Sequence, residues 1–337
     1  MPSEIKPICG LDRTKLSEVV PLQMPFTLFV FPTTFCNFRC NYCGHSLGFQ
    51  EMKERYGFAP QQMPMDTYRR ILSQAKEFPG KLKLFSLTGH GEPLLNPNIA
   101  EMVAMAKEAN IAERIEIISN ASLLTNATAQ KLIDAGLDTL RISIQGLSSQ
   151  KYQEVCGYKL DFDEFIANIR FFYEHKKTTK LFVKVMNIAL NPGEDELFYK
   201  TFENISDRMY IEHCRPVYDG VSYSGEARKI SDRYGREHKR RDVCPLAFFM
   251  FGIFPDGDVE PCDTIYKPVV VGNVNKETMM EIWRGKKLRE FQLLQLSKRR
   301  YDNPKCAVCC APDDVSHPED CLDDDAERLL ELFNKQR

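Results

Sequence analysis

The sequence of 337 residues contains no run of about 18 apolar residues, the length that a membrane-spanning helix needs. Its first ten residues, MPSEIKPICG, lack the basic start and apolar core of a secretion signal. The sequence therefore predicts a cytoplasmic protein with no membrane partner. The 45 basic and 47 acidic residues nearly cancel, which gives no support for nucleic acid as the main partner. An apolar fraction of 43% excludes disorder over most of the chain.

Cysteine is abundant, with twelve residues. The cytosol keeps thiols reduced, so a disulfide framework is not expected without a secretion signal, and metal binding is the remaining explanation. Nine of the twelve fall into two groups, whereas Cys9, Cys156 and Cys214 lie outside them. The first group is Cys36, Cys40 and Cys43, and the second is Cys244, Cys262, Cys306, Cys309, Cys310 and Cys321.

Strand-like and helix-like segments alternate through the first two thirds of the chain. The candidate strands are residues 26–31, 83–87, 114–118, 139–144, 181–187 and 208–213, and the candidate helices are near 66–77, 98–109, 126–135, 163–175 and 194–203. Such alternation predicts βαβ units and a parallel sheet, either doubly wound or a partial barrel. A full eight-unit barrel usually needs about 250 residues, and here the alternation stops near residue 213.

The sequence divides into four parts: an N-terminal extension (1–25), the α/β domain (26–213), a charged linker or mobile loop (214–243) and a smaller cysteine-bound domain (244–337). In the last part, Pro255-Asp256-Gly257 predicts a hairpin turn between two strand-like segments. Helices are expected near 277–295 and 323–335.

The first cysteine group follows the first predicted strand, in the segment FCNFRCNYC (residues 35–43), with the spacing Cys-x3-Cys-x2-Cys. A structural zinc site wants four ligands, typically as two separated pairs. A four-iron cluster also usually takes four thiolates. Three thiolates would leave one iron with open coordination, so a substrate or cofactor could bind the metal directly.

This motif resembles that of the radical S-adenosylmethionine (radical SAM) enzymes, and the resemblance covers nearly the whole chain. It implies an α/β fold, a partial (β/α)6 barrel with a small C-terminal auxiliary-cluster domain. It also implies a [4Fe-4S] cluster whose open iron binds S-adenosylmethionine, and an external reductant such as flavodoxin or ferredoxin. In that family, one electron cleaves the cofactor to a 5′-deoxyadenosyl radical, which abstracts a hydrogen atom from the substrate.

The resemblance assigns further residues to S-adenosylmethionine. Most follow the ends of predicted strands, where parallel α/β architectures bind ligands. For each one, a strand-end cap or a turn is the alternative role. The assigned residues are Tyr42, Gly89, Gly91, Glu92, Ser119, Asn120, Ser143 and Asn187.

Individual roles follow from the same resemblance. Tyr42 is similar to the aromatic residue beside the adenine. The stretch TGHGEP (residues 88–93) resembles the Gly-Gly-Glu-Pro that approaches the methionine amino group, with a histidine in place of the second glycine. Ser119 and Asn120 resemble a ribose-contacting pair, and Ser143 a residue near the methionine carboxylate.

One departure from the family pattern concerns Cys156. Relatives often have an Arg-Gly pair after the fourth strand, and the Arg can pair with the methionine carboxylate. This chain has Val155-Cys156-Gly157. Either another cation takes that role or Cys156 returns a hydrogen atom to the substrate. A buried apolar cysteine is the alternative.

The second cysteine group resembles the C-terminal auxiliary-cluster domains of the same superfamily, known as SPASM and the shorter Twitch. A full SPASM domain would hold two clusters, but here the cysteine run is broken, which predicts one auxiliary [4Fe-4S] cluster. A zinc knuckle would fit the ligand count equally well. The predicted ligands are Cys244, Cys262, Cys306 and Cys309, with Cys310 or Cys321 able to replace one of them.

The resemblance implies a radical SAM oxidoreductase. A fully ligated auxiliary cluster suits an oxidation in which it takes the second electron, such as that of a sugar or aminocyclitol alcohol to a ketone. The alternatives within the family are an epimerase or a peptide-modifying enzyme of the crosslink, epimerisation or formylglycine type. A two-cluster electron carrier and a zinc scaffold are the alternatives outside it.

The sequence favours a small-molecule substrate, because the 35 residues before Cys36 are too few for a leader-binding domain, although a peptide substrate stays open. The polar stretch 215–241 could cover the mouth of the barrel, or be a solvated linker. The side chains in it that could hold a polyol or an anion are Arg215, Tyr218, Arg228 and Tyr234.

Overall fold

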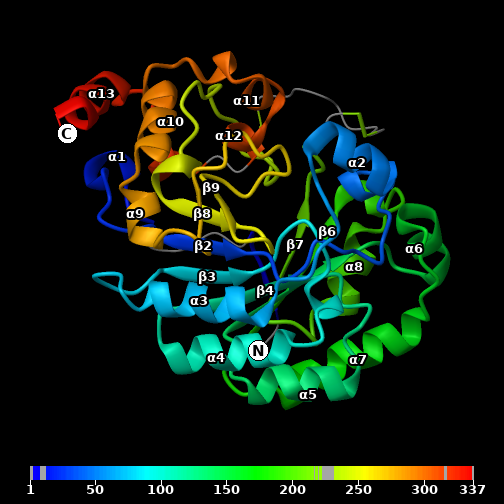
Figure 1. The fold of residues 1–337 in the computed structure, drawn as a ribbon. Coiled ribbons are helices and arrows are strands. Elements are labelled where there is room, and N and C mark those ends of the chain that lie inside the picture. The colour runs from blue at the N-terminus through cyan, green and yellow to red at the C-terminus, as the bar shows by residue number, and fades with distance from the viewer. Residues whose placement is uncertain are drawn as a thin grey trace.

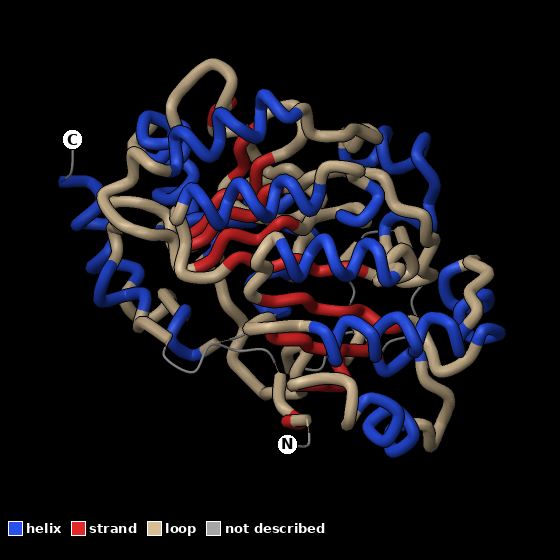
Figure 2. Tube along the Cα trace, turned by 90° about the horizontal axis from the view of Figure 1, so that it is seen from below, coloured by secondary structure: helices blue, strands red, loops and turns tan. Residues whose placement is uncertain are grey.

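The computed structural model describes residues 3–7, 13–215, 217–218, 220–221, 231–314 and 317–335. Six strands are neighbours in chain order and pair in parallel, with helices covering the outer side of the sheet (Figures 1 and 2). The strands are β2 (Thr27–Val30), β3 (Leu84–Leu87), β4 (Ile115–Ser119), β5 (Thr139–Ile144), β6 (Lys180–Met186) and β7 (Arg208–Glu212). This is the predicted partial (β/α)6 barrel.

The five predicted barrel helices are confirmed as α3 (Met65–Ala75), α4 (Ile99–Ala109), α5 (Asn126–Asp134), α7 (Phe162–His175) and α8 (Asp195–Phe202). Two further helices were not predicted, α2 (Gly48–Tyr56) and α6 (Ser149–Cys156). The single helix expected over 277–295 is two helices, α9 (Met279–Trp283) and α10 (Lys286–Leu296), because extended backbone at Gly285 interrupts it.

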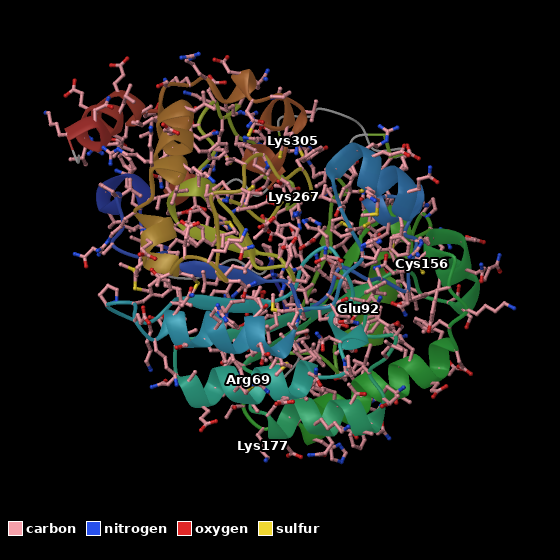
Figure 3. All side chains as sticks on the ribbon, viewed as in Figure 1. Arg69, Glu92, Cys156, Lys177, Lys267 and Lys305 are labelled. Carbon is pink, nitrogen blue, oxygen red and sulfur yellow. The ribbon has the colours of Figure 1, made fainter. Side chains whose placement is uncertain are left out.

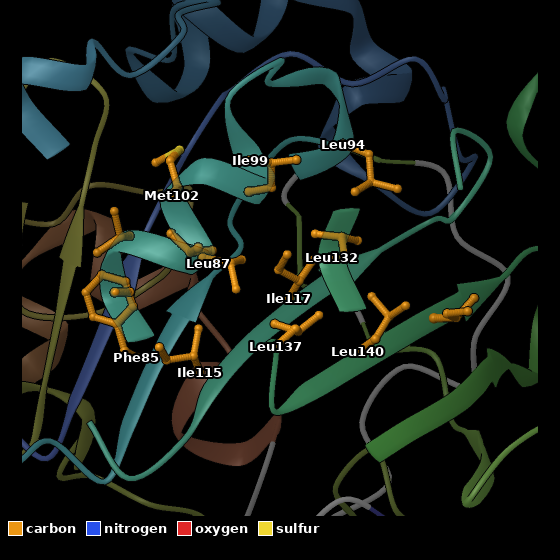
Figure 4. Close-up of a cluster of buried hydrophobic side chains, with 14 of the residues drawn as sticks. Phe85, Leu87, Leu94, Ile99, Met102, Ile115, Ile117, Leu132, Leu137 and Leu140 are labelled. Atoms are coloured by element: carbon orange, nitrogen blue, oxygen red, sulfur yellow. The ribbon is translucent and has the colours of Figure 1, made fainter. Parts of the chain in front are cut away.

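Alternation along the strands sends one set of side chains outward into the main core. Apolar residues of β3, β4 and β5 pack there against α4 and α5 (Figure 4). Each such side chain contributes about 1.5–3 kcal/mol when it is fully buried. The labelled members are Phe85, Leu87, Leu94, Ile99, Met102, Ile115, Ile117, Leu132, Leu137 and Leu140.

The other set of strand side chains points to the inside of the barrel and includes buried charged residues. The Nζ of Lys184 on β6 donates to Glu212 Oε2 on β7 at 2.8 Å, and Arg141 on β5 lies 3.4 Å from Glu116 on β4. Glu116 and Glu212 are 1% and 0% exposed. Burying a charge is costly unless the charge is paired, and here each of these cations pairs with an anion on the neighbouring strand.

The C-terminal region extends the same sheet. β8 (Met250–Ile253) pairs in parallel with β2, and the predicted hairpin leads to β9 (Asp258–Glu260), which pairs with β10 (Gly272–Asn273). The sequence predicts a separate smaller domain here, but its strands continue the barrel sheet. The parallel β2–β8 pairing joins segments more than 200 residues apart, and no local sequence pattern predicts it.

The remaining elements pack around this sheet. Two short helices, α11 (Pro304–Val308) and α12 (Ala311–Asp314), follow α10, and the predicted acidic helix is α13 (Ala326–Lys335). At the N-terminus, β1 (Glu4–Ile5) pairs with β7, and α1 (Leu16–Val19) follows it. No helix among the described residues is long and apolar enough to cross a membrane.

The segment 214–243 is described only in part, and Arg228 and Cys9 lie outside the described residues. In the described part, the backbone N–H of His213 donates to Arg233 O at 2.7 Å, and that of Arg233 donates to Asp314 O at 2.9 Å. This part of the segment therefore joins the end of β7 to α12.

Gly252, in the middle of β8, provides a test of this packing. A Cβ at this position would lie 2.4 Å from the carbonyl oxygen of Cys262. We therefore expect Gly252→Ala to destabilise the protein by about 1–3 kcal/mol and to lower its midpoint of thermal unfolding. Gly80→Ala is the matched control, because its nearest neighbour, Met24 Sδ, is 3.8 Å away. Equal midpoints for the two variants would contradict the close contact at Gly252.

Candidate active site

The three cysteines of the first motif lie on the loop after β2 and line one cavity of about 200 Å³. Backbone contacts hold this loop at the C-terminal ends of the strands. Thr34 N–H donates to Gln61 O at 2.9 Å, and Glu92 N–H donates to Phe35 O at 2.7 Å. The sequence therefore places three thiols, Cys36, Cys40 and Cys43, around one open space.

Helix α6 supports the far side of this loop. The backbone N–H of Arg39 donates to Cys156 O at 2.9 Å, and that of Asn41 donates to Val155 O at 2.8 Å. The last carbonyls of a helix have no partner within it, so the loop and the helix end satisfy each other. Phe38 is 1% exposed, and its ring packs at a tilt against that of Tyr158 with 4.8 Å between the ring centroids, which anchors the loop between its cysteines.

The two glycines of TGHGEP (residues 88–93) let this turn pack against the cysteine loop. A Cβ on Gly91 would lie 2.5 Å from Thr33 O and 2.7 Å from Phe35 O. Gly89 has a φ of +140°, and a Cβ there would lie 2.4 Å from the Phe31 ring. Both positions therefore exclude any other residue type.

Glu92, in the segment after β3, binds the end of β4. Its carboxylate accepts hydrogen bonds from Ser119 Oγ at 2.6 Å, Asn120 N–H at 2.7 Å and Leu94 N–H at 3.0 Å. The side chain is 2% exposed, and burial raises the pKa of Glu92 to about 7 although these donors lower it. Asn120 in turn donates to Asn37 Oδ1 at 3.0 Å, so the network reaches the cysteine loop.

His90, which replaces the usual second glycine, has a structural contact of its own. Its Nε2 lies 2.7 Å from the carbonyl oxygen of Asp263, the residue after Cys262. Burial lowers the pKa of His90 to about 4, so the ring is neutral and Nε2–H donates. His90 therefore ties the turn of the first site to the loop of the second.

Seven of the eight residues that the resemblance assigns to S-adenosylmethionine line the 200 Å³ cavity with the three cysteines. They are Tyr42, Gly89, Gly91, Glu92, Ser119, Asn120 and Ser143. The Tyr42 hydroxyl donates to Gln145 Oε1 on the same wall. Asn187 does not line the cavity, since its Oδ1 accepts from Cys214 N–H at 2.9 Å.

Cys156 also lies outside the cavity lining. It is 1% exposed at the end of α6, its thiol contacts that of Cys40, and Sγ donates to Tyr152 O at 2.9 Å (Figure 3). This placement is that of a buried cysteine behind the motif. The geometry therefore does not support the predicted transfer of a hydrogen atom from Cys156 to a substrate.

The opposite wall of the cavity carries two charged residues that sequence reasoning missed, Lys184 and Glu212. Glu212 Oε2 accepts from Lys184 and lies 3.6 Å from Arg233, whereas Oε1 has no hydrogen-bond partner among the described residues. Burial would raise the pKa of Glu212, but Lys184, Arg233 and Arg141 outweigh it and lower the pKa to about 2. A lysine and a glutamate inside otherwise apolar strands were the available signal.

The second cysteine group forms a smaller and more enclosed site. Cys244, Cys262, Cys306 and Cys309 line one cavity of about 20 Å³ between β9, α11 and the residues before β8. Burial raises the pKa of Cys244 to about 12 and that of Cys306 to about 11, whereas the charge of Arg300 lowers both.

The other two cysteines of the second group lie elsewhere. The charges near the Cys310 thiol are those of Asp314, Arg215 and Arg233, and Cys321 Sγ lies 3.8 Å from Asp323 Oδ2. Neither lines the auxiliary cavity.

Comparison with known families decides the class of this protein. The description of the Radical SAM superfamily matches residues 30–204, more than half of the chain, and that of the SPASM iron–sulfur cluster-binding domain matches residues 244–310. The chain belongs to the radical SAM superfamily. This radical SAM protein therefore has a [4Fe-4S] cluster that binds S-adenosylmethionine and an auxiliary iron–sulfur cluster.

Two curated relatives show the range of the similarity. A tungsten-containing aldehyde ferredoxin oxidoreductase cofactor-modifying protein of Pyrococcus furiosus is 23% identical over 326 residues, which cover 85% of this chain and 87% of that protein. A probable GTP 3′,8-cyclase of Metallosphaera sedula is 34% identical over 219 residues, which cover 64% of this chain and 62% of the cyclase.

Three solved structures share the fold. BtrN in complex with AdoMet and 2-DOIA has a TM-score of 0.55 at 19% identity and covers 85% of this chain and 93% of that one. Streptococcus suis SuiB bound to the precursor peptide SuiA has a TM-score of 0.60 at 20% identity, over 81% of this chain and 68% of that one. AnSMEcpe with bound AdoMet has a TM-score of 0.58 at 15% identity, over 92% and 100%.

The residues present fit both cofactors. The first site combines three thiols with an open cavity whose walls offer carboxylate, hydroxyl and amide groups. The second combines four thiols with a buried guanidinium whose Nε has no partner among the described residues. An anionic iron–sulfur cluster suits a site of thiols and a buried cation.

The Glu92 network leads to a test that needs no substrate. Glu92→Gln would turn an NH2 group toward the N–H and O–H donors that the carboxylate now accepts. We therefore expect a loss of about 1–3 kcal/mol, seen as a lower midpoint of thermal unfolding. Glu108→Gln on the exposed face of α4 is the control and should leave the midpoint unchanged. An unchanged midpoint for Glu92→Gln would contradict the role of this carboxylate in binding the end of β4.

Proposed function

We propose that this chain is a radical SAM oxidoreductase that oxidises a secondary alcohol of a small polar molecule, a sugar or an aminocyclitol, to a ketone. When bound, the first cluster and S-adenosylmethionine supply a 5′-deoxyadenosyl radical that removes one hydrogen atom from the carbinol carbon. Once loaded, the auxiliary cluster would supply the acceptor for the second electron, and with loss of one proton to water this would complete a two-electron oxidation.

The contrast between the two cavities carries this proposal. The first cavity, of about 200 Å³, has room beside its three thiols, whereas the second, of about 20 Å³, has four thiols and little further space. A cluster ligated by four cysteines has no iron left for a substrate. It can therefore serve as an electron acceptor and does not hold the reacting molecule.

The proposed ligands follow from this arrangement. Cys36, Cys40 and Cys43 hold the catalytic cluster, and the seven cavity-lining residues named above surround S-adenosylmethionine. The auxiliary cluster is held by Cys244, Cys262, Cys306 and Cys309.

The charged wall supports a small polar substrate. Glu212 Oε1 is buried, ionised and without a partner among the described residues, so it can accept a hydrogen bond from a substrate hydroxyl. Glu212 lies two residues beyond Tyr210, the residue opposite Lys184, toward the C-terminal strand ends. We assign this wall to the substrate.

The cations and anions around that wall nearly balance. Arg141, Lys184 and Arg233 face Glu116, Glu212 and Asp314. A hydroxyl-bearing molecule without negative charge suits this balance better than a polyanion. The proposal also keeps the cytoplasmic location and an external flavodoxin or ferredoxin as the first electron donor, as the sequence predicts.

An epimerase and a peptide-modifying enzyme are the competing functions. An epimerase must return a hydrogen atom to the substrate, and the thiol predicted for that step, Cys156, lies behind Cys40 and outside the cavity lining. Because the fold is similar to that of SuiB bound to its precursor peptide, a peptide-modifying enzyme is the function that would replace the proposed alcohol oxidation.

The division of labour between the cysteine groups can be measured by iron content. Two four-iron clusters predict about eight irons per chain in anaerobically prepared protein. Replacing Cys36, Cys40 and Cys43 together by Ala should leave about four irons and abolish release of 5′-deoxyadenosine. Loss of all iron, or retained cleavage of S-adenosylmethionine, would contradict the assignment, and about twelve irons in the native protein would indicate a third cluster.

The substrate class can be tested with 2-DOIA and myo-inositol, each deuterated at its hydroxyl-bearing carbons. We expect deuterium in 5′-deoxyadenosine and one ketone per cofactor cleaved. Glu212→Gln should raise KM about 10–100-fold, because a hydrogen bond to a charged group contributes about 1.5–3 kcal/mol.

Glu290→Gln, an exposed change on α10, is the matched control for Glu212→Gln. An epimer in place of the ketone would exclude the oxidation, and an unchanged KM would remove Glu212 from the substrate wall. Deuterium transfer from a peptide alone would identify the peptide class.

A further inference from the structure

Arg300 is a buried cation in the wall of the auxiliary cavity. It lies just before α11, is 3% exposed and lines the cavity with the four cysteines. Its Nη1 donates to Cys306 O at 2.9 Å and to Cys309 O at 3.3 Å, and its Nη2 donates to the Tyr301 hydroxyl at 3.0 Å. The guanidinium is thus fixed by backbone carbonyls of two of the predicted cluster ligands.

No carboxylate balances this charge. Within the described ranges, Arg300 forms no ion pair, and its buried Nε has no hydrogen-bond partner. Removing an unpaired charge from water costs several kcal/mol, and an orphaned buried donor adds to that cost. An anion with acceptor atoms beside the guanidinium would remove both costs.

The neighbouring charges do not supply that anion. Glu260 on β9 is a nearby buried carboxylate, and its Oε1 lies 3.8 Å from Lys267 Nζ. Lys305 also lines the cavity, but it is exposed and its Nζ donates to Lys267 O at 3.0 Å (Figure 3). Arg300 is therefore the cation that faces the four thiols from a site shielded from water.

We propose that Arg300 donates its Nε–H to the auxiliary iron–sulfur cluster and raises the reduction potential of that cluster. The proposal rests on the four-cysteine auxiliary cluster of the proposed function. Hydrogen bonds to cluster sulfurs and the local charge both set the potential of such a centre. One-electron reduction adds a negative charge, which a fixed cation stabilises, so reduction becomes more favourable.

A raised potential favours electron transfer toward the auxiliary cluster. An electron acceptor for a substrate radical has to be reducible by that radical, and a higher potential makes this transfer more favourable. The side chains named as lining the first cavity include no arginine, and Lys184 there is already paired with Glu212. The two sites thus differ in charge as well as in the number of thiols.

The experiment is a potentiometric titration of full-length holoenzyme, followed by electron paramagnetic resonance. Addition of S-adenosylmethionine identifies the signal of the catalytic cluster, because that cluster alone binds it. In Arg300→Met, the equilibrium constant for reduction of the auxiliary cluster should fall about tenfold, a shift of about 59 mV for one electron. The catalytic cluster should keep its potential and is an internal control.

Two further variants separate the contributions. Arg299→Met removes a neighbouring but exposed arginine, 68% accessible and paired with Asp302, and should shift neither cluster. Arg300→Lys keeps the charge but loses the Nε–H donor, so its shift should be smaller than that of Arg300→Met. If Arg300→Met does not retain its auxiliary iron, the potential of the auxiliary cluster in Arg300→Lys tests the proposal.

The outcomes are distinct. An auxiliary potential in Arg300→Met equal to that of the native protein, with about eight irons retained, would overturn the proposal and leave the proposed function standing. A native potential in Arg300→Lys, where the methionine variant has lost iron, would also overturn it. About four irons in the native protein would remove the auxiliary cluster itself and hence the proposed function.

Discussion

The parallel pairing of β2 with β8 is the interaction on which both cysteine sites depend. The ladder runs from Thr27 opposite Met250 to Val30 opposite Ile253, and it continues where Phe31 N–H donates to Ile253 O at 2.9 Å. The first cysteine loop follows one of these strands, and the hairpin that leads to Cys262 follows the other. Backbone hydrogen bonds therefore hold the two sites beside each other, whatever the segment 214–243 does. The contact of His90 with Asp263 O closes the same junction from the side.

The two cavities differ in the kind of buried polar atom that is left without a partner. Among the described residues that line the first cavity, Lys184 and Glu212 are paired, and the buried polar atom left without a partner is the acceptor Glu212 Oε1. In the auxiliary cavity, the unmatched group is a donor, the Nε–H of Arg300. An unsatisfied acceptor favours a hydroxyl or an amine, and an unsatisfied donor favours an anion. The polarity of the orphaned atoms thus separates the place of the substrate from the place of the cluster.

Local sequence patterns were sufficient where the structure depends on local spacing. The six strands, five barrel helices and the hairpin at Pro255-Asp256-Gly257 follow from periodicity and turn residues. The spacing of the cysteines predicted both cysteine sites. Helix α6 was missed because it is short and polar, yet its carbonyls anchor the first loop. Lys184 and Glu212 could not be paired from sequence, because strand register is a property of the folded sheet. For the same reason, Cys156 suggested chemistry that its position behind Cys40 does not support.

The β2–β8 ladder also has a consequence for biosynthesis. Strand β2 leaves the ribosome more than 200 residues before Met250, so one of its edges has no partner until about three quarters of the chain has been made. During that interval the chain presents an unpaired apolar strand next to three reduced thiols, which exposes it both to strand-to-strand aggregation and to oxidation. Exclusion of oxygen would remove the second of these hazards, and earlier pairing of the free edge would remove the first.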